Sequence, residues 1–293
     1  MVSDRQFILP NFLIPGAPKA GTSTLHFYLS KHPDIFMSPR KEPAFFSYRW
    51  HLGVEEYSRA FAGYSGQKMV GEATPSYIHH PESAARIKQY IPDVKLIFTL
   101  REPVKRAQSH YWHRVKTRHE KRDINAVLLG SKGEYPVECG LYATHIKRFR
   151  DLFPRDNMYF NVLEEMQRDS AGKLRAIFAF LGVDDNTEIG EIEPINRAQL
   201  ARSFLIQDSL EAVRGRSRLK SIVPGWLKPT GVRLYRKIRN WNIRDFEPPE
   251  LTPQQRRHLE ELFLPEIKEL ETLLGRDLSI WYRDYDIVQE KVA

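Results

Sequence analysis

The chain has 293 residues, 41% of them hydrophobic, with a formal net charge of +8. This length and apolar content fit one large α/β domain with a substantial core. No Gly/Ser-rich or Pro-rich linker divides it, so we expect a single domain over residues 1–293. The basic balance indicates polyanionic partners, such as nucleic acid, sulfated or phosphorylated ligands or a membrane surface, without choosing among them.

Cysteine usage and hydropathy exclude several other classes of protein. Cys139 is the only cysteine, which excludes an intrachain disulfide and a Cys-rich metal site. Residues 1–11 contain Asp4 and lack the apolar core of a signal peptide. No apolar run approaches the roughly 20 residues that span a bilayer. We therefore expect a cytoplasmic protein.

A strand, a tight loop and a helix are predicted over residues 12–31. The apolar run at 12–14 predicts a buried strand, and Pro15 and Gly16 end it. Apolar residues at helical spacing follow over 25–29. Such a loop directs backbone N–H groups at one place, and the helix N-terminus adds partial positive charge, which together suit a phosphate or sulfate-like anion.

The residues of this loop strengthen the prediction of an anion site. Lys19 adds a full positive charge, and residues 22–24 add hydroxyl groups. A nucleotide P-loop has a glycine, four residues and then Gly-Lys-Ser/Thr. Here Gly16 and Gly21 keep that separation, but Thr22 occupies the lysine position. A turn that binds nothing is the alternative for this stretch taken alone.

A possible general base follows in the segment 41–43, Lys-Glu-Pro. We expect Phe45 and Phe46 to anchor this segment and to leave Glu42 partly desolvated, which would raise its pKa above the ordinary value of about 4.3. The alternative is a surface turn with an incidental carboxylate. The rival bases are His26, His32 and His110.

Short apolar runs predict further strands, and apolar residues at helical spacing predict further helices. Strands are expected over 35–37, 69–72, 94–100 and 158–163, and helices over 54–61, 83–91, 103–116, 141–153 and 174–181. Thr252 and Gln255 predict a capping box, with Pro253 in the first turn of a final helix.

The strand over 94–100 ends in Arg101, at the edge where open α/β sheets bind ligands. Ser109 follows two turns into the next helix. A guanidinium and a hydroxyl that converge suit a second phosphate. A P-loop NTPase typically has a Mg²⁺-binding Asp near such a strand end, so Arg101 argues against a magnesium nucleotide. The alternative is an ordinary surface ion pair between Arg101 and Glu102 or another acid.

Two polar segments have less definite roles. Residues 117–138 have few apolar positions and predict an exposed insertion or lid. Residues 202–244 are strongly basic, with apolar residues at every third position over 232–241. We favour a helix with a solvated basic face. The other interpretation is a contact surface for an anionic acceptor, a cofactor phosphate or lipid head groups.

Taken together, these stretches resemble the sulfotransferases that use 3′-phosphoadenosine 5′-phosphosulfate (PAPS). The strand-associated segments 18–25 and 101–103, with Arg106, Ser109 and Tyr111, resemble their 5′-phosphosulfate loop and 3′-phosphate motif. Similarity to the carbohydrate branch, the heparan sulfate sulfotransferases and their bacterial relatives, lies in residues 32–34, 41–46, 140–142, 180–182 and 274–278.

The resemblance implies a P-loop-like three-layer α/β fold, a central parallel sheet flanked by helices. It implies PAPS as donor, 3′,5′-bisphosphoadenosine (PAP) as product, and transfer without a metal. It implies that Glu42 is the base and that Lys19 stabilises the leaving phosphate. The implied cofactor-binding residues are Lys19, Ala20, Gly21, Thr22, Ser23, Thr24, Arg101 and Ser109.

The acceptor is left open between a sugar, a lipid and a small molecule, through a hydroxyl or an amine. Ala73 stands where the heparan sulfate enzymes have a lysine between Glu and Thr-Pro, which argues against a heparan-type acceptor. No recognised nucleic-acid motif is present. The alternatives are a P-loop kinase or other NTP-using enzyme, and a non-enzymatic protein that binds anions or membranes through residues 202–244. The sequence does not indicate an oligomeric state.

Overall fold

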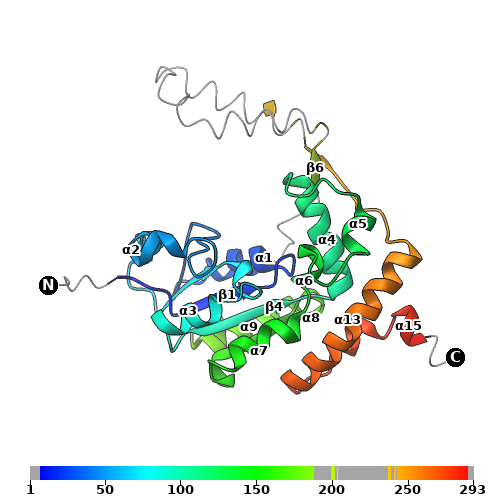
Figure 1. Cartoon of the computed structure of the whole chain (residues 1–293). Helices are drawn as coiled ribbons and strands as arrows, with labels where there is room; N and C mark the ends of the chain where they lie inside the picture. The colour runs from blue at the N-terminus through cyan, green and yellow to red at the C-terminus, as the bar shows by residue number, and fades with distance from the viewer. Residues whose placement is uncertain are drawn as a thin grey trace. The chain divides into compact units, whose positions relative to one another are not determined.

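The computed structural model describes most of the chain, in two compact units (Figure 1). The described residues are 7–187, 199–201, 203, 237–238, 241 and 243–289. The larger unit comprises Met1–Tyr111, Arg122–Ile195 and Leu251–Ala293, and the smaller one Trp112–Lys121 and Asn196–Glu250. The prediction of a single domain over residues 1–293 stays a prediction.

A five-stranded parallel sheet forms the centre of the larger unit. Its strands are β1 (Phe12–Gly16), β2 (Ile35–Met37), β3 (Met69–Ala73), β4 (Lys95–Leu100) and β5 (Met158–Val162). Their order is β2-β3-β1-β4-β5, and every neighbouring pair is parallel. Because parallel strands end at the same edge, the loops after β3, β1 and β4 are neighbours. The predicted central parallel sheet is confirmed.

Helices connect and cover these strands. They are α1 (Thr22–Leu29), α2 (Gly53–Ser58), α3 (Ser83–Tyr90), α4 (Pro103–Lys116), α5 (Ile124–Leu128), α6 (Tyr135–Glu138), α7 (Tyr142–Arg150), α8 (Leu163–Arg168), α9 (Ser170–Leu181), α13 (Pro253–Leu274), α14 (Ser279–Tyr282) and α15 (Asp286–Gln289).

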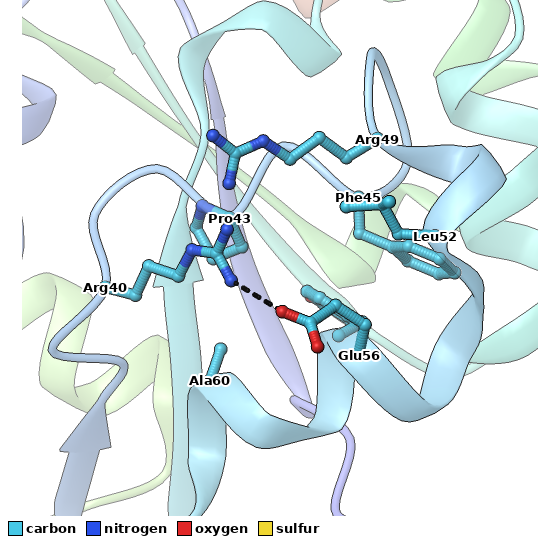
Figure 2. Close-up of a pocket in the computed structure, with 8 residues that line it drawn as sticks. Arg40, Pro43, Phe45, Arg49, Leu52, Glu56 and Ala60 are labelled. Atoms are coloured by element: carbon cyan, nitrogen blue, oxygen red, sulfur yellow. Dashed lines mark hydrogen bonds and ion pairs between the residues drawn. The ribbon is translucent and has the colours of Figure 1, made fainter. Parts of the chain in front are cut away.

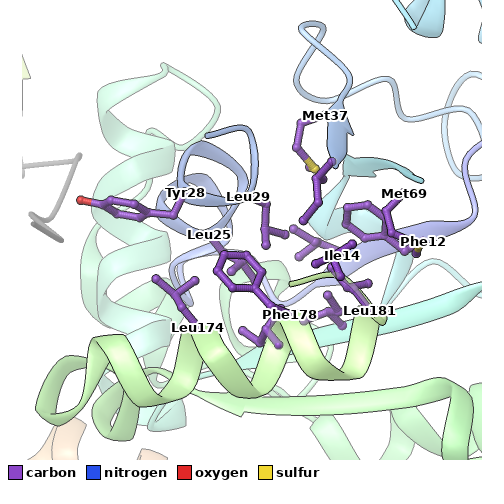
Figure 3. Close-up of a cluster of buried hydrophobic side chains, with 14 of the residues drawn as sticks. Phe12, Ile14, Leu25, Tyr28, Leu29, Met37, Met69, Leu174, Phe178 and Leu181 are labelled. Carbon is purple, nitrogen blue, oxygen red and sulfur yellow. The ribbon is translucent and has the colours of Figure 1, made fainter. Parts of the chain in front are cut away.

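Successive side chains of β4 show that helices cover both faces of the sheet. Ile97 belongs to a buried cluster that includes Leu25 of α1 and Phe178 of α9 (Figure 3). The next residue, Phe98, packs its ring 5.1 Å from that of Phe149 on α7. Since successive side chains of a strand point to opposite faces, α7 lies across the sheet from α1 and α9. The predicted three-layer arrangement is confirmed.

The final long helix begins as predicted. The Thr252 hydroxyl accepts a hydrogen bond from the Gln255 N–H (3.3 Å), and the Gln255 side-chain oxygen accepts one from the Thr252 N–H (2.9 Å). Pro253 is the first residue of α13, where its missing N–H costs nothing. The helix then continues through Pro265 to Leu274.

The expectation of an exposed insertion over 117–138 is wrong for α5 and α6, which lie within this stretch. Val127, Leu128 and Val137, on α5 and α6, are fully buried. The Gln255 side-chain amide also donates to the Asn125 side-chain oxygen (2.7 Å). A few apolar residues in a charged stretch are enough to dock these short helices on the body of the larger unit.

The smaller unit contains one described strand pair. Strands β6 (Gln199–Ala201) and β7 (Ile243–Asp245) pair antiparallel. Almost all of the basic segment 202–244 lies outside the described residues, and with it the choice between its two interpretations. Across the described part of the chain, no helix combines the length and apolarity needed to cross a membrane.

Candidate anion and acceptor site

The loop after β1 is held from both sides, by β4 and by the segment that follows β3. The Ala17 N–H donates to the Thr99 carbonyl (2.6 Å), and the Thr99 hydroxyl donates to the Gly16 carbonyl (3.2 Å). On the other side, the Ile78 N–H donates to the Pro15 carbonyl (2.8 Å). The loop is therefore fixed at the centre of the sheet edge.

The backbone of this loop turns sharply into α1. Lys19 has φ 68° and Gly21 has φ 89°, both in the left-handed region. This conformation favours glycine at Gly21, where a Cβ would also lie 2.9 Å from Leu163 Cδ1 and would push that side chain aside. The first N–H groups of any helix have no acceptor within it. Thr22, Ser23 and Thr24 present theirs at this turn, as the predicted anion site requires.

The second predicted anion group, Arg101, lies against the same loop. Its guanidinium donates to the Lys19 carbonyl (3.3 Å). The Tyr142 hydroxyl holds its backbone, donating to the Arg101 carbonyl (2.9 Å) and accepting from the Arg101 N–H (3.4 Å). The structure thus brings Lys19 and Arg101 together from adjacent strands, although they are far apart in the sequence.

Glu102 has a structural role that differs from the expected alternative of an ion pair with Arg101. Its carboxylate accepts from the N–H groups of Val104 (2.7 Å) and Lys105 (2.8 Å) at the start of α4, and from the Tyr285 hydroxyl (2.5 Å). Burial raises the pKa of Glu102, although these hydrogen bonds lower it. Glu102 therefore secures the helix that follows Arg101.

Arg106 and Ser109, on α4, have different surroundings. Arg106 is fully buried; it donates to the Pro136 carbonyl and contacts His110 Nδ1 at 3.2 Å. It therefore stabilises the body of the larger unit. Ser109 is partly exposed, two turns into the helix as predicted.

The acceptor-side segment is anchored as predicted, but Glu42 is not desolvated. Phe45 and Phe46 are 3% and 0% exposed, whereas the Glu42 side chain is 48% exposed. Its carboxylate pairs with the Lys41 ammonium at 3.2 Å. The expected apolar setting of Glu42 is wrong because the two rings point into the core while the carboxylate faces outward.

The rival histidines all have structural partners. His26 contacts the Ser38 carbonyl (3.0 Å), and His32 contacts the Asp184 carbonyl (2.9 Å). His110 contacts buried Arg106. Burial lowers the pKa of His26, and the charge of Lys41 lowers it further.

The sequence analysis missed Glu72, a buried carboxylate next to this segment. Glu72 is fully buried in the last part of β3 and accepts from the hydroxyls of Tyr57 (3.2 Å) and Thr74 (2.8 Å). Burial raises its pKa to about 7, against the effect of these donors. The available signal was a lone charged residue ending an apolar strand.

A shallow depression lies beside the Glu42 segment (Figure 2). Its volume is about 220 Å³, including space open to solvent. The lining residues are Arg40, Pro43, Phe45, Arg49, Leu52, Glu56, Tyr57 and Ala60. Arg40 reaches across to Glu56, with 3.4 Å between the guanidinium and the carboxylate. Two arginines, one of them paired with Glu56, thus lie around an apolar floor.

Comparison with known proteins identifies the family to which this chain belongs. The model of the sulfotransferase domain matches residues 9–271. The membrane-associated sulfotransferase kil1 of Dictyostelium discoideum is 41% identical over 113 residues, covering 38% of this chain and 24% of kil1. Heparan sulfate glucosamine 3-O-sulfotransferase 3B1 of Mus musculus is 32% identical over 182 residues, covering 60% of this chain and 46% of that protein. The matches thus span less than half of these two relatives.

A solved structure agrees over more of the chain. The sulfotransferase from Alicyclobacillus acidocaldarius has a TM-score of 0.68 and 29% identity, covering 94% of this chain and 99% of that one. The resemblance to sulfotransferases, including the carbohydrate branch, is confirmed by these matches. The chain belongs to the sulfotransferase domain family.

Proposed function

We propose that the protein is a PAPS-dependent sulfotransferase that transfers a sulfuryl group to a hydroxyl or amine of a carbohydrate. The observation that carries the proposal is the contact between the Arg101 guanidinium and the Lys19 carbonyl. It joins the two predicted anion-binding segments at the ends of adjacent strands, which suits a ligand with two separate anionic groups. Family membership supports the sulfuryl chemistry, and the similarity to heparan sulfate enzymes supports a sugar acceptor.

The donor set fits PAPS. An ammonium from Lys19, the N–H groups at the start of α1 and the hydroxyls of residues 22–24 would hold the 5′-phosphosulfate. Arg101 and Ser109 would hold the 3′-phosphate. PAPS supplies an activated sulfuryl group whose transfer leaves a phosphate oxygen with developing negative charge. Lys19 would stabilise that charge and keep the donor in line.

Glu42 would take the proton from the acceptor. A hydroxyl is a poor nucleophile until a base within hydrogen-bond reach removes its proton. The exposure of Glu42 leaves its carboxylate accessible to an acceptor, and the nearby depression offers arginines and an apolar floor for a sugar ring. A lipid or small-molecule acceptor is the second candidate, supported by the aromatic residues of that floor.

The test is a transfer assay with radiolabelled PAPS and a panel of oligosaccharides, lipids and phenols. We expect labelled sulfate on a saccharide.

Glu42→Gln should keep its affinity for PAP and lose about 10²- to 10⁴-fold in turnover, the usual contribution of a positioned base. Glu55→Gln, which alters an exposed carboxylate on α2, is the matched control and should behave as wild type. Near-normal turnover of Glu42→Gln would contradict the assignment of the base.

A further inference from the structure

Two backbone N–H groups of the segment that carries Glu42 are bound by side chains from beyond β3. The Ala44 N–H donates to the Thr74 hydroxyl oxygen (3.2 Å), and the Phe46 N–H donates to the Tyr77 hydroxyl oxygen (3.4 Å). These bonds connect segments that are about 30 residues apart in the sequence. They attach the segment just after Glu42 to the edge of the sheet.

The Thr74 hydroxyl is in turn bound to Glu72. It donates to Glu72 Oε2 (2.8 Å). A hydroxyl has one hydrogen and two lone pairs. When its hydrogen points to a carboxylate, a lone pair is left for a backbone N–H. Glu72 thus orients the Thr74 hydroxyl as an acceptor toward the segment 41–46.

The conformation of the segment depends on such support. Ala44 has φ 57°, in the left-handed region that residues other than glycine rarely adopt. Its carbonyl accepts from the Arg49 N–H (2.9 Å), so both of its backbone polar groups are bound. Without the bond to Thr74, Ala44 could relax to an ordinary conformation and redirect Glu42, two residues earlier.

We propose that Glu72 is a positioning residue, which acts through Thr74 to hold the segment 41–46 and thereby to aim the Glu42 carboxylate. Glu72 is fully buried and does not touch an acceptor itself. Tyr57, on α2, donates to its other oxygen (3.2 Å), so the same carboxylate also connects the segment to that helix. The holding of the segment by Glu72 does not depend on the function of the protein, whereas the effect on turnover rests on the proposed sulfotransferase function.

The experiment compares Glu72→Gln, Thr74→Val and Thr74→Ser in the full-length protein. Hydrogen–deuterium exchange of a peptide covering residues 41–47 measures the segment directly, without any need for activity. We expect exchange roughly 5- to 10-fold faster in Glu72→Gln and Thr74→Val, since one buried hydrogen bond contributes about 1 kcal/mol. Thr74→Ser keeps the hydroxyl and should restore protection.

Turnover provides the second readout. With a saccharide acceptor found in the transfer assay, we expect kcat to fall at least tenfold in Glu72→Gln and Thr74→Val, with PAP affinity unchanged and Thr74→Ser near wild type. Glu260→Gln, which removes a fully buried carboxylate on α13, controls for loss of a buried charge and should leave kcat and the segment's exchange unchanged.

Several outcomes would overturn the proposal. These are wild-type exchange in Glu72→Gln, equal loss in Thr74→Ser and Thr74→Val, or equal acceleration in Glu260→Gln. Faster exchange with unchanged kcat would contradict the claim that Glu72 positions the Glu42 carboxylate for turnover. If the wild-type protein transferred no sulfate, the proposed function would fail, while the exchange data would still decide the role of Glu72.

Discussion

The guanidinium of Arg101 is directed by restraints on its own backbone. Tyr142 binds both the N–H and the carbonyl of Arg101, and Glu102 fixes the start of α4 immediately after it. The side chain therefore leaves a rigid support at the end of β4. Such preorganisation reduces the entropy lost when a charged group binds a ligand.

We predict that Arg101→Ala weakens PAP binding more than Ser109→Ala does. A charged hydrogen bond contributes about 1.5–3 kcal/mol, against about 1 kcal/mol for a neutral hydroxyl. Isothermal titration calorimetry with PAP measures both losses. Arg175→Ala, at an exposed position of α9, is the control for removal of an arginine. Unchanged affinity in Arg101→Ala would remove this residue from the cofactor site.

For single residues, the sequence predicts the position at the end of a strand or helix better than it predicts the surroundings of the side chain. Lys19 and Arg101 follow apolar strands, so their meeting at one sheet edge could be predicted. The exposure of Glu42 could not, because it depends on the loop conformation. Glu72 was missed since a single acid in a strand gives no periodic signal, and one of its donors, Tyr57, comes from a separate helix.

Among the elements, α13 is the one whose start the sequence defines best. Its capping box was predictable because both of its hydrogen bonds are local, over three residues. The short helices α5 and α6 were not, because their burial depends on docking rather than on a repeating apolar pattern. Capping residues close in the sequence thus define where a helix begins, while tertiary contacts decide which polar stretches are buried.

Thr252→Ala should destabilise the protein by about 1 kcal/mol, the usual effect of losing an N-cap side chain. Urea denaturation monitored by circular dichroism measures the change in the free energy of unfolding. Thr272→Ala, in an exposed position near the other end of α13, is the matched control and should cost little, because alanine favours helix. Equal destabilisation by both changes would show that the capping box contributes nothing specific.

For the whole molecule, we predict that PAP raises the thermal stability much more than ATP with Mg²⁺ does. A ligand at 100 times its dissociation constant adds roughly 2.7 kcal/mol to the free energy of unfolding. The reason for this prediction is that Arg101, which contacts the loop at Lys19, stands where a magnesium nucleotide site would have an aspartate. Differential scanning fluorimetry with each ligand provides the comparison. Equal stabilisation by the two ligands, or PAP binding that needs a metal, would favour the NTP-using alternative.

The strand order β2-β3-β1-β4-β5 has a consequence for how such an enzyme could diversify. The proposed donor contacts come from the loop after β1 and from the residues after β4, whereas Glu42 and its supports come from the segment after β2 and from the end of β3 and the residues after it. Mutations on the acceptor side could therefore accumulate without disturbing nucleotide recognition. Exchange of residues 38–61 between relatives should then change which molecule is sulfated while the recombinant protein still uses the same donor.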